Sequence, residues 1–85
     1  MKQGDQLFFK RDGQLYTIQQ IIWEETTGII RQLNVQNEKC QMTIFLNAPH
    51  LMTLFIKAFK YVNEEGQKEE LDEILSLCQA SSRGN

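Results

Sequence analysis

The sequence contains little of what most enzymes, secreted domains and membrane proteins need. Its 85 residues include one histidine, one proline and two cysteines, too few for a disulfide framework or a Cys/His zinc site. No apolar run approaches the roughly 20 residues of a membrane helix, and the first residues lack the apolar stretch of a secretory signal. We therefore expect a cytoplasmic protein in which Cys40 and Cys78 are buried free thiols, rather than a disulfide or a metal pair.

Groups that carry catalysis are equally scarce. His50 lies in the first turn of a predicted helix, where the helix dipole disfavours a protonated imidazole. Glu24 and Glu25 are adjacent on a predicted turn, so their carboxylates point in different directions. No Gly-rich phosphate loop or nucleophile elbow occurs. We expect no enzymatic activity, no cofactor and no metal ion.

The size of the chain predicts one domain with a small core. At 10.0 kDa it has no room for two cores, and a deep cleft would take residues away from the only one. We expect residues 1–80 to form a single α+β domain. Residues 81–85, with the sequence Ser-Ser-Arg-Gly-Asn, are typical of a disordered tail.

The first half of the chain predicts four strands, over 7–11, 15–23, 29–35 and 40–46. Asp12-Gly13 between two runs rich in aromatic and β-branched residues indicates a hairpin with a type I′ turn. Alternation in the last two runs predicts inward and outward sets of side chains. The inward set is Ile29, Leu33, Val35, Cys40, Met42, Ile44 and Leu46, and the outward, solvated set is Gln32, Asn34, Gln41 and Thr43. Short turns between successive strands predict an antiparallel meander.

The second half predicts two helices. Asn47 is a suitable N-cap, Ala48-Pro49 fits a first helical turn, and apolar residues recur at spacings of three and four up to Val62. Asn63-Glu64-Glu65-Gly66 would end this helix, and a second would follow over about 67–80. The predicted fold is therefore ββββαα, with both helices packed on one face of a four-stranded sheet.

Charge is distributed unevenly, because residues 64–73 contain six acids and the single base Lys68. At helical spacing these acids could form a stripe for a basic surface of a larger protein partner, although a solvated helix face is the simpler interpretation. The candidate partner-binding residues are Glu64, Glu65, Glu69, Glu70, Asp72 and Glu73. Trp23, just before the Glu24-Glu25 turn, is expected at the edge of the core; if exposed, it would be an interface anchor.

A second candidate surface lies in the N-terminal hairpin, where aromatic and basic side chains alternate. Such a strand pair could stack and neutralise nucleic acid, or could simply bury one aromatic face. Its residues are Phe8, Lys10, Arg11 and Tyr16. The net charge of −2 and the pI near 5.3 argue against a dedicated nucleic-acid binder.

Several segments resemble small phage-borne anti-CRISPR inhibitors of Cas9. The similar stretches are Tyr16-Thr17-Ile18, Ile29-Ile30-Arg31 and Ala58-Phe59-Lys60, in the order of a short sheet, a helix and a Glu-rich second helix. This chain departs from that pattern because it lacks a predicted N-terminal helix and is only weakly acidic overall. The resemblance implies an acidic DNA mimic that occupies the PAM-binding site, with the six acids of 64–73 as its contacts.

We expect a non-enzymatic protein-binding module that regulates or inhibits a larger partner. Two alternatives remain open. One is a homodimeric assembly module that pairs through a sheet edge or the polar sheet face. The other is a nucleic-acid-binding regulator that uses the N-terminal hairpin.

Overall fold

A computed structural model describes residues 1–75 of the chain. These residues form six strands and one complete helix, and a second helical segment starts at residue 71. The elements are β1 (Gln6–Phe9), β2 (Gln14–Trp23), β3 (Ile30–Gln36), β4 (Gln41–Phe45), α1 (Pro49–Ala58), β5 (Phe59–Val62) and β6 (Lys68–Glu70). The predicted disordered tail and residues 76–80 of the predicted second helix lie outside the described residues.

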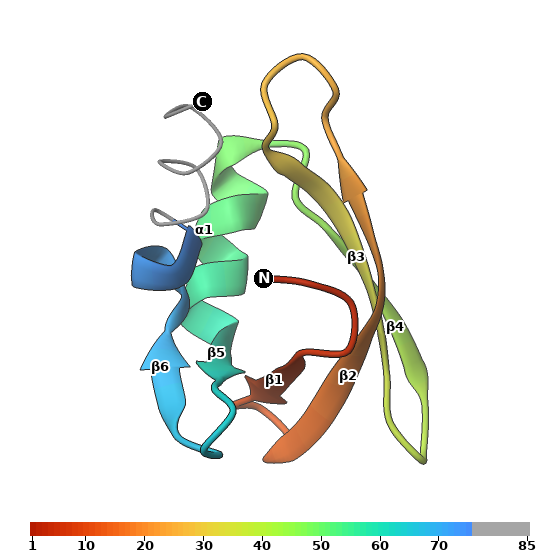
Figure 1. Cartoon of the computed structure of the whole chain (residues 1–85), viewed down its shortest axis with the longest axis vertical. Helices are drawn as coiled ribbons and strands as arrows, with labels where there is room; N and C mark the ends of the chain where they lie inside the picture. Colours follow the sequence, from red (N-terminus) through yellow and green to blue (C-terminus); the bar gives the residue numbers. More distant parts are fainter. Residues whose placement is uncertain (76–85) are drawn as a thin grey trace.

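All described strands belong to one antiparallel sheet with the order β4-β3-β2-β1-β5-β6. The sheet curves around α1, which carries the chain from β4 at one edge to β5 beside β1 (Figure 1). The predicted α+β class and the four-stranded meander are confirmed. The prediction of only four strands is wrong, because β5 and β6 extend the sheet beyond β1.

The core lies on the concave face of the sheet, the inner face. Leu7, Ile18 and Leu33 are fully buried there, and Phe55 of α1 and Leu71 of the final helical segment cover them. Met1 also packs against this cluster, because the N-terminal segment lies between α1 and β2 (Figure 1). Both helical segments therefore contribute to the inner face, as the sequence predicted.

The first hairpin is confirmed, but its predicted type I′ turn is wrong. Phe9 pairs with Gln14, so the loop contains four residues, 10–13. Only Gly13 in this loop has a positive φ, of 68°, whereas a type I′ turn needs two such residues. The Gly13 N–H donates to the Phe9 carbonyl at 2.9 Å and closes the wider loop.

The first predicted helix is too long at both ends. Ala48, not Asn47, is the N-cap, and it makes no side-chain capping bond. The helix ends at Ala58 because Phe59 turns to extended backbone, while its N–H still donates to the Phe55 carbonyl. From there Phe59 and Tyr61 face the core at a spacing of two. Phe55, Phe59 and Val62 are also separated by four and three positions, so the same short run has the apolar spacing of a helix.

The second predicted helix is wrong over residues 67–70, which complete a hairpin. The Asn63 carbonyl oxygen Oδ1 accepts the backbone N–H groups of Glu65 and Gln67 at 3.0 and 2.9 Å. Gly66 adopts a φ of 81° in the same turn. Asparagine and glycine serve equally well at a helix end and in a tight turn, so their presence did not distinguish the two.

The predicted inward set of the meander is mostly confirmed. Leu33, Val35 and Leu46 are buried, and Met42 and Ile44 pack against the core. Two members are wrong. Ile29 is 39% exposed, because the register shift between the pairs Ile22–Gln32 and Trp23–Ile30 inserts Arg31 into β3 and turns Ile30, rather than Ile29, toward the core. Cys40 is an exposed free thiol just before β4, and Cys78 lies outside the described residues.

The predicted outward set is confirmed on the convex face, the outer face. Gln32 pairs with Phe45, Asn34 with Thr43, and Gln36 with Gln41. Asn34 also donates from Nδ2 to Gln20 Oε1 at 2.8 Å. Over residues 1–75, no helix is both long and apolar enough to cross a membrane.

Candidate functional site

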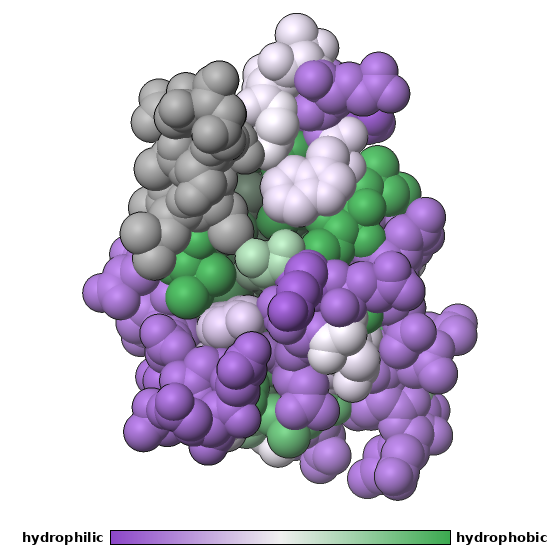
Figure 2. Space-filling view, viewed as in Figure 1, coloured by the Kyte–Doolittle hydropathy of each residue, from purple (hydrophilic) through white to green (hydrophobic). Residues whose placement is uncertain are grey.

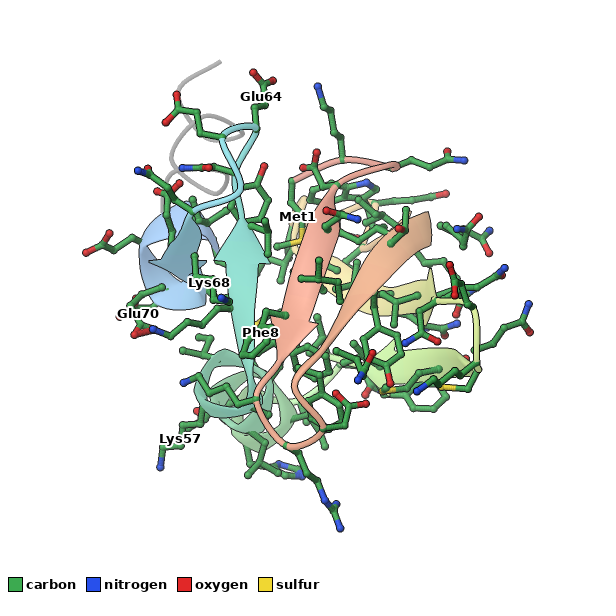
Figure 3. The ribbon with its side chains drawn as sticks, turned by 90° about the horizontal axis from the view of Figure 1, so that it is seen from below. Met1, Phe8, Lys57, Glu64, Lys68 and Glu70 are labelled. Carbon is green, nitrogen blue, oxygen red and sulfur yellow. The ribbon has the colours of Figure 1, made fainter. Side chains whose placement is uncertain are left out.

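The six predicted acidic contacts lie on three elements and do not form a helical stripe. Glu64 and Glu65 are in the β5–β6 turn, Glu69 and Glu70 are on β6, and the last two acids start the final helical segment. Figure 3 shows Glu64 at the tip of the hairpin and Glu70 farther along it. The stripe geometry is therefore wrong, because residues 68–70 form a strand.

Glu69 and Glu70 point to opposite faces of β6. Glu69 pairs across the strands with Tyr61, and its Oε2 accepts a hydrogen bond of 2.9 Å from Asn63 Nδ2. Glu70 is on the outer face, where its Oε1 lies 3.6 Å from Lys60 Nζ. Both carboxylates thus have partners within the hairpin. They are less suited to contact another protein than the acids described next.

The other four acids are exposed and form no ion pair within residues 1–75. They are Glu64, Glu65, Asp72 and Glu73. In Figure 2 the hydrophilic residues cover the lower left of the molecule, over the β5–β6 hairpin. Together these acids outnumber Lys60 and Lys68 of the same hairpin, so the described part of this end has a net negative charge that could attract a basic surface.

The alternative nucleic-acid residues are not brought together on one surface. Phe8 pairs with Leu15 on the outer face, whereas Tyr16 pairs with Leu7 on the inner face and is only 3% exposed. Lys10 and Arg11 are exposed in the loop between β1 and β2. A base stacked on Phe8 would therefore not reach the Tyr16 ring.

Phe8 instead lies against basic residues from the C-terminal part of the sheet. Lys68 Nζ is 4.6 Å from the centroid of the Phe8 ring, and Lys60 is the cross-strand partner of Phe8 (Figure 3). Sequence analysis missed this cluster because it depends on β5 and β6. Recognising the alternation of Phe59 to Val62 as a strand would have revealed it.

The hydroxyl of Tyr16 joins two polar groups at the hairpin end of the sheet. It donates to Asp12 Oδ2 at 2.5 Å, and its oxygen lies 3.5 Å from Cys40 Sγ. The hydrogen bond to Asp12 raises the pKa of Tyr16 above its ordinary value, with smaller effects from Cys40 and burial. Tyr16 therefore stays protonated at neutral pH and serves as a structural donor.

A groove of about 370 Å³ lies at the opposite end of the sheet. It lies between the β2–β3 loop, the end of β4 and the first turns of α1. Apolar residues contribute most of its wall, and a few polar residues form its rim. We call it the end groove; it is lined by Glu24, Thr27, Ile29, Ile30, Arg31, Leu46, Asn47, Ala48, Pro49 and Met52.

Backbone hydrogen bonds hold the β2–β3 side of the end groove in place. The Glu24 N–H donates to the Ile29 carbonyl at 2.7 Å, and the Gly28 N–H returns to the Glu24 carbonyl at 2.8 Å. Gly28 has a φ of 72°, which favours glycine at this position. On the β4 side, the Leu46 N–H donates to the Arg31 carbonyl at 2.7 Å.

Large side chains are exposed in and beside the end groove. Trp23 is the cross-strand partner of Ile30 and is 40% exposed, and Ile29 is exposed to nearly the same degree. Figure 2 shows apolar surface between α1 and the upper ends of β2 and β3. Arg31 Nε lies 3.9 Å from Glu24 Oε2 at the rim. An apolar floor, a tryptophan and a polar rim are typical of a protein-binding patch.

The described part of the chain has few groups placed for metal binding or catalysis. Residues 1–75 contain no group of three or more His, Cys, Asp or Glu side chains placed to hold a metal ion. His50 is exposed in the first turn of α1. No family model, curated protein or solved structure matches the chain. The resemblance to Cas9 inhibitors stays a prediction.

Proposed function

We propose that this chain is a non-enzymatic protein-binding module that occupies part of the surface of a larger protein. The observation that carries the proposal is the end groove, with Ile29 exposed in its wall and Trp23 exposed beside it. A soluble domain gains nothing in stability from leaving a tryptophan 40% exposed next to an apolar concavity. A partner side chain inserted into the end groove would bury both the apolar wall of the groove and the Trp23 side chain.

The charge of the module favours a partner with a basic surface. The four acids that form no ion pair within residues 1–75 lie away from the end groove, so they need not contact the bound partner. Their field would increase the rate of encounter and reject acidic proteins, while the groove would supply most of the binding energy. Glu69 and Glu70 already have partners in the hairpin, so they contribute less to this field.

The test is an affinity capture with matched exposed-side-chain variants. The tagged wild-type chain, Trp23→Ala and Leu54→Ala are compared on nuclease-treated bacterial lysate. Leu54 is the control because it is 59% exposed on α1 and does not line the groove. We expect one protein to be retained by the wild type and by Leu54→Ala, and to be lost with Trp23→Ala. Binding to the purified partner should then weaken at least about tenfold.

Charge is tested separately in Glu64→Gln with Glu65→Gln. We expect this double variant to slow association and to reduce its salt dependence, with little change in dissociation. Equal retention of the partner by Trp23→Ala and the wild type would contradict binding at the end groove. Recovery of nucleic acid alone would contradict a protein partner.

A further inference from the structure

The two edges of the sheet differ sharply in how they are protected. The β6 edge has three residues, all charged: Lys68, Glu69 and Glu70. The β4 edge has five residues with the sequence Gln-Met-Thr-Ile-Phe, which contains no charge and no proline. Proteins normally shield an exposed edge strand with short length, charge, proline or a bulge. Among these devices β6 shows two, whereas β4 pairs with β3 in an unbroken register.

The hydrogen-bonding pattern identifies the groups that β4 leaves open. The Leu46 N–H donates to Arg31 of the neighbouring strand, and the Cys40 carbonyl accepts from Asn37. In an antiparallel pair, backbone groups alternate between the two sides of a strand. Even-numbered residues from Cys40 to Leu46 therefore bond to β3. The N–H and C=O groups of Gln41, Thr43 and Phe45 face outward, where no strand of residues 1–75 pairs with them.

We infer that the β4 edge binds a second copy of this chain, in an antiparallel pair with its two-fold axis at Thr43. This register pairs Gln41 with Phe45 of the other copy and Thr43 with its own counterpart. In this register each of the three outward-facing residues of one copy lies opposite an outward-facing residue of the other. Each of these three pairs exchanges two backbone hydrogen bonds, which gives six in total. A shift of the axis by one residue would keep only four.

The side chains in this register are also mutually compatible. On the inner face Met42 meets Ile44 of the other copy, and both residues are only partly buried in the single chain. On the outer face Thr43 meets its counterpart, and Phe45, which is 56% exposed, is covered beside Gln41. The paired segments contain no charged side chain, so no like charges oppose each other. A second copy therefore fits this edge.

This inference is independent of the proposed function, because it concerns a different surface. The groove test can fail while the chain dimerises, and the reverse can also occur. The outcome for β4 is read from mass alone and does not require a captured partner.

The test measures the mass of the full chain in solution by sedimentation velocity over a wide range of concentration. We expect a species of twice the 10.0 kDa chain mass that dissociates on dilution. Thr43→Lys places two ammonium groups opposite each other at the axis and should weaken the dimer at least about tenfold. Thr53→Lys adds the same charge on exposed α1 surface and should leave it unchanged.

A cross-linking variant tests the register directly. Thr43→Cys, in a chain that also carries Cys40→Ser and Cys78→Ser, should form a disulfide-linked dimer on mild oxidation. Hydrogen-bonded antiparallel pairs have Cα atoms about 5.5 Å apart, within the range of a disulfide. Circular dichroism confirms that each variant is folded before comparison. A wild-type chain that stays at 10.0 kDa overturns the inference, as does a dimer that Thr43→Lys leaves intact or Thr43→Cys cannot cross-link.

Discussion

The Tyr61 hydroxyl donates a hydrogen bond of 3.0 Å to Asp5 Oδ2, across 56 positions of the sequence. Asp5 also binds the start of the chain, because its Oδ2 accepts the Lys2 N–H at 3.0 Å. Its backbone carbonyl accepts the Ile18 N–H at 2.8 Å. This one acidic residue therefore connects the N-terminal segment to β2 and to β5.

Tyr61 should make the protein sensitive to alkali. Burial, followed by the hydrogen bond to Asp5, raises the pKa of Tyr61 to about 12. In the unfolded chain tyrosine has its ordinary pKa of about 10. The stabilisation is therefore complete below about pH 10 and is lost as the pH rises toward 12. Denaturant titrations should show a steeper loss of unfolding free energy above pH 10 for the wild type than for Tyr61→Phe. Equal slopes would contradict this assignment.

Asn63 should be the most important turn residue. Its side chain makes hydrogen bonds to Glu65, Gln67 and Glu69, so Asn63→Ala should lower the unfolding free energy by about 1–3 kcal/mol. Asn47→Ala is the control, since Asn47 does not cap α1. Urea denaturation of both variants gives the comparison. A larger loss at Asn47 would support the helical start predicted from sequence.

Leu33 tests the position of the core. It is fully buried in β3, so Leu33→Ala should cost about 2–5 kcal/mol of unfolding free energy. Leu54→Ala removes the same atoms from an exposed site on α1 and should change the unfolding free energy by less than about 0.5 kcal/mol. Thermal unfolding measures both. Similar losses at the two positions would place the core elsewhere.

Lys68 and Phe8 should be energetically coupled. The ammonium group lies 4.6 Å from the ring centroid at a partly exposed site, where a cation–π contact contributes about 0.5–1 kcal/mol. A double-mutant cycle with Phe8→Leu and Lys68→Met should recover a coupling energy of this size. Lys57→Met is a matched control, because Lys57 is exposed on α1 and makes no ring contact within residues 1–75. Additive effects of Phe8→Leu and Lys68→Met would contradict the contact.

The meander could be predicted from sequence because its signals are local. Alternation, β-branched residues and Asp12-Gly13 each act within a few positions, and they correctly placed Leu33 and Val35 in the core. The end of α1 could not be predicted in this way. The Lys10 N–H donates to the Ala58 carbonyl at 3.0 Å, so the transition from α1 to β5 depends on a loop that is distant in the sequence.

The candidate sites, too, could be predicted from sequence only in part. Trp23 could be named from sequence only as a conditional anchor, because its position just before the Glu24-Glu25 turn predicts the edge of the core and does not determine its exposure. The end groove could not be predicted, since the β2–β3 loop meets α1 only through the curvature of the sheet. The acids of residues 64–73 were found, but their arrangement depended on whether that segment was a helix or a hairpin.

The position of β1 has a consequence for synthesis on the ribosome. Although β1 precedes the other described strands in the sequence, it lies inside the sheet between β2 and β5. A nascent chain can form the meander early, but one side of β1 stays unpaired until residues 59–62 emerge. A transcript cut short in α1 would therefore yield a product with two open strand edges, prone to aggregation and to degradation by cellular proteases.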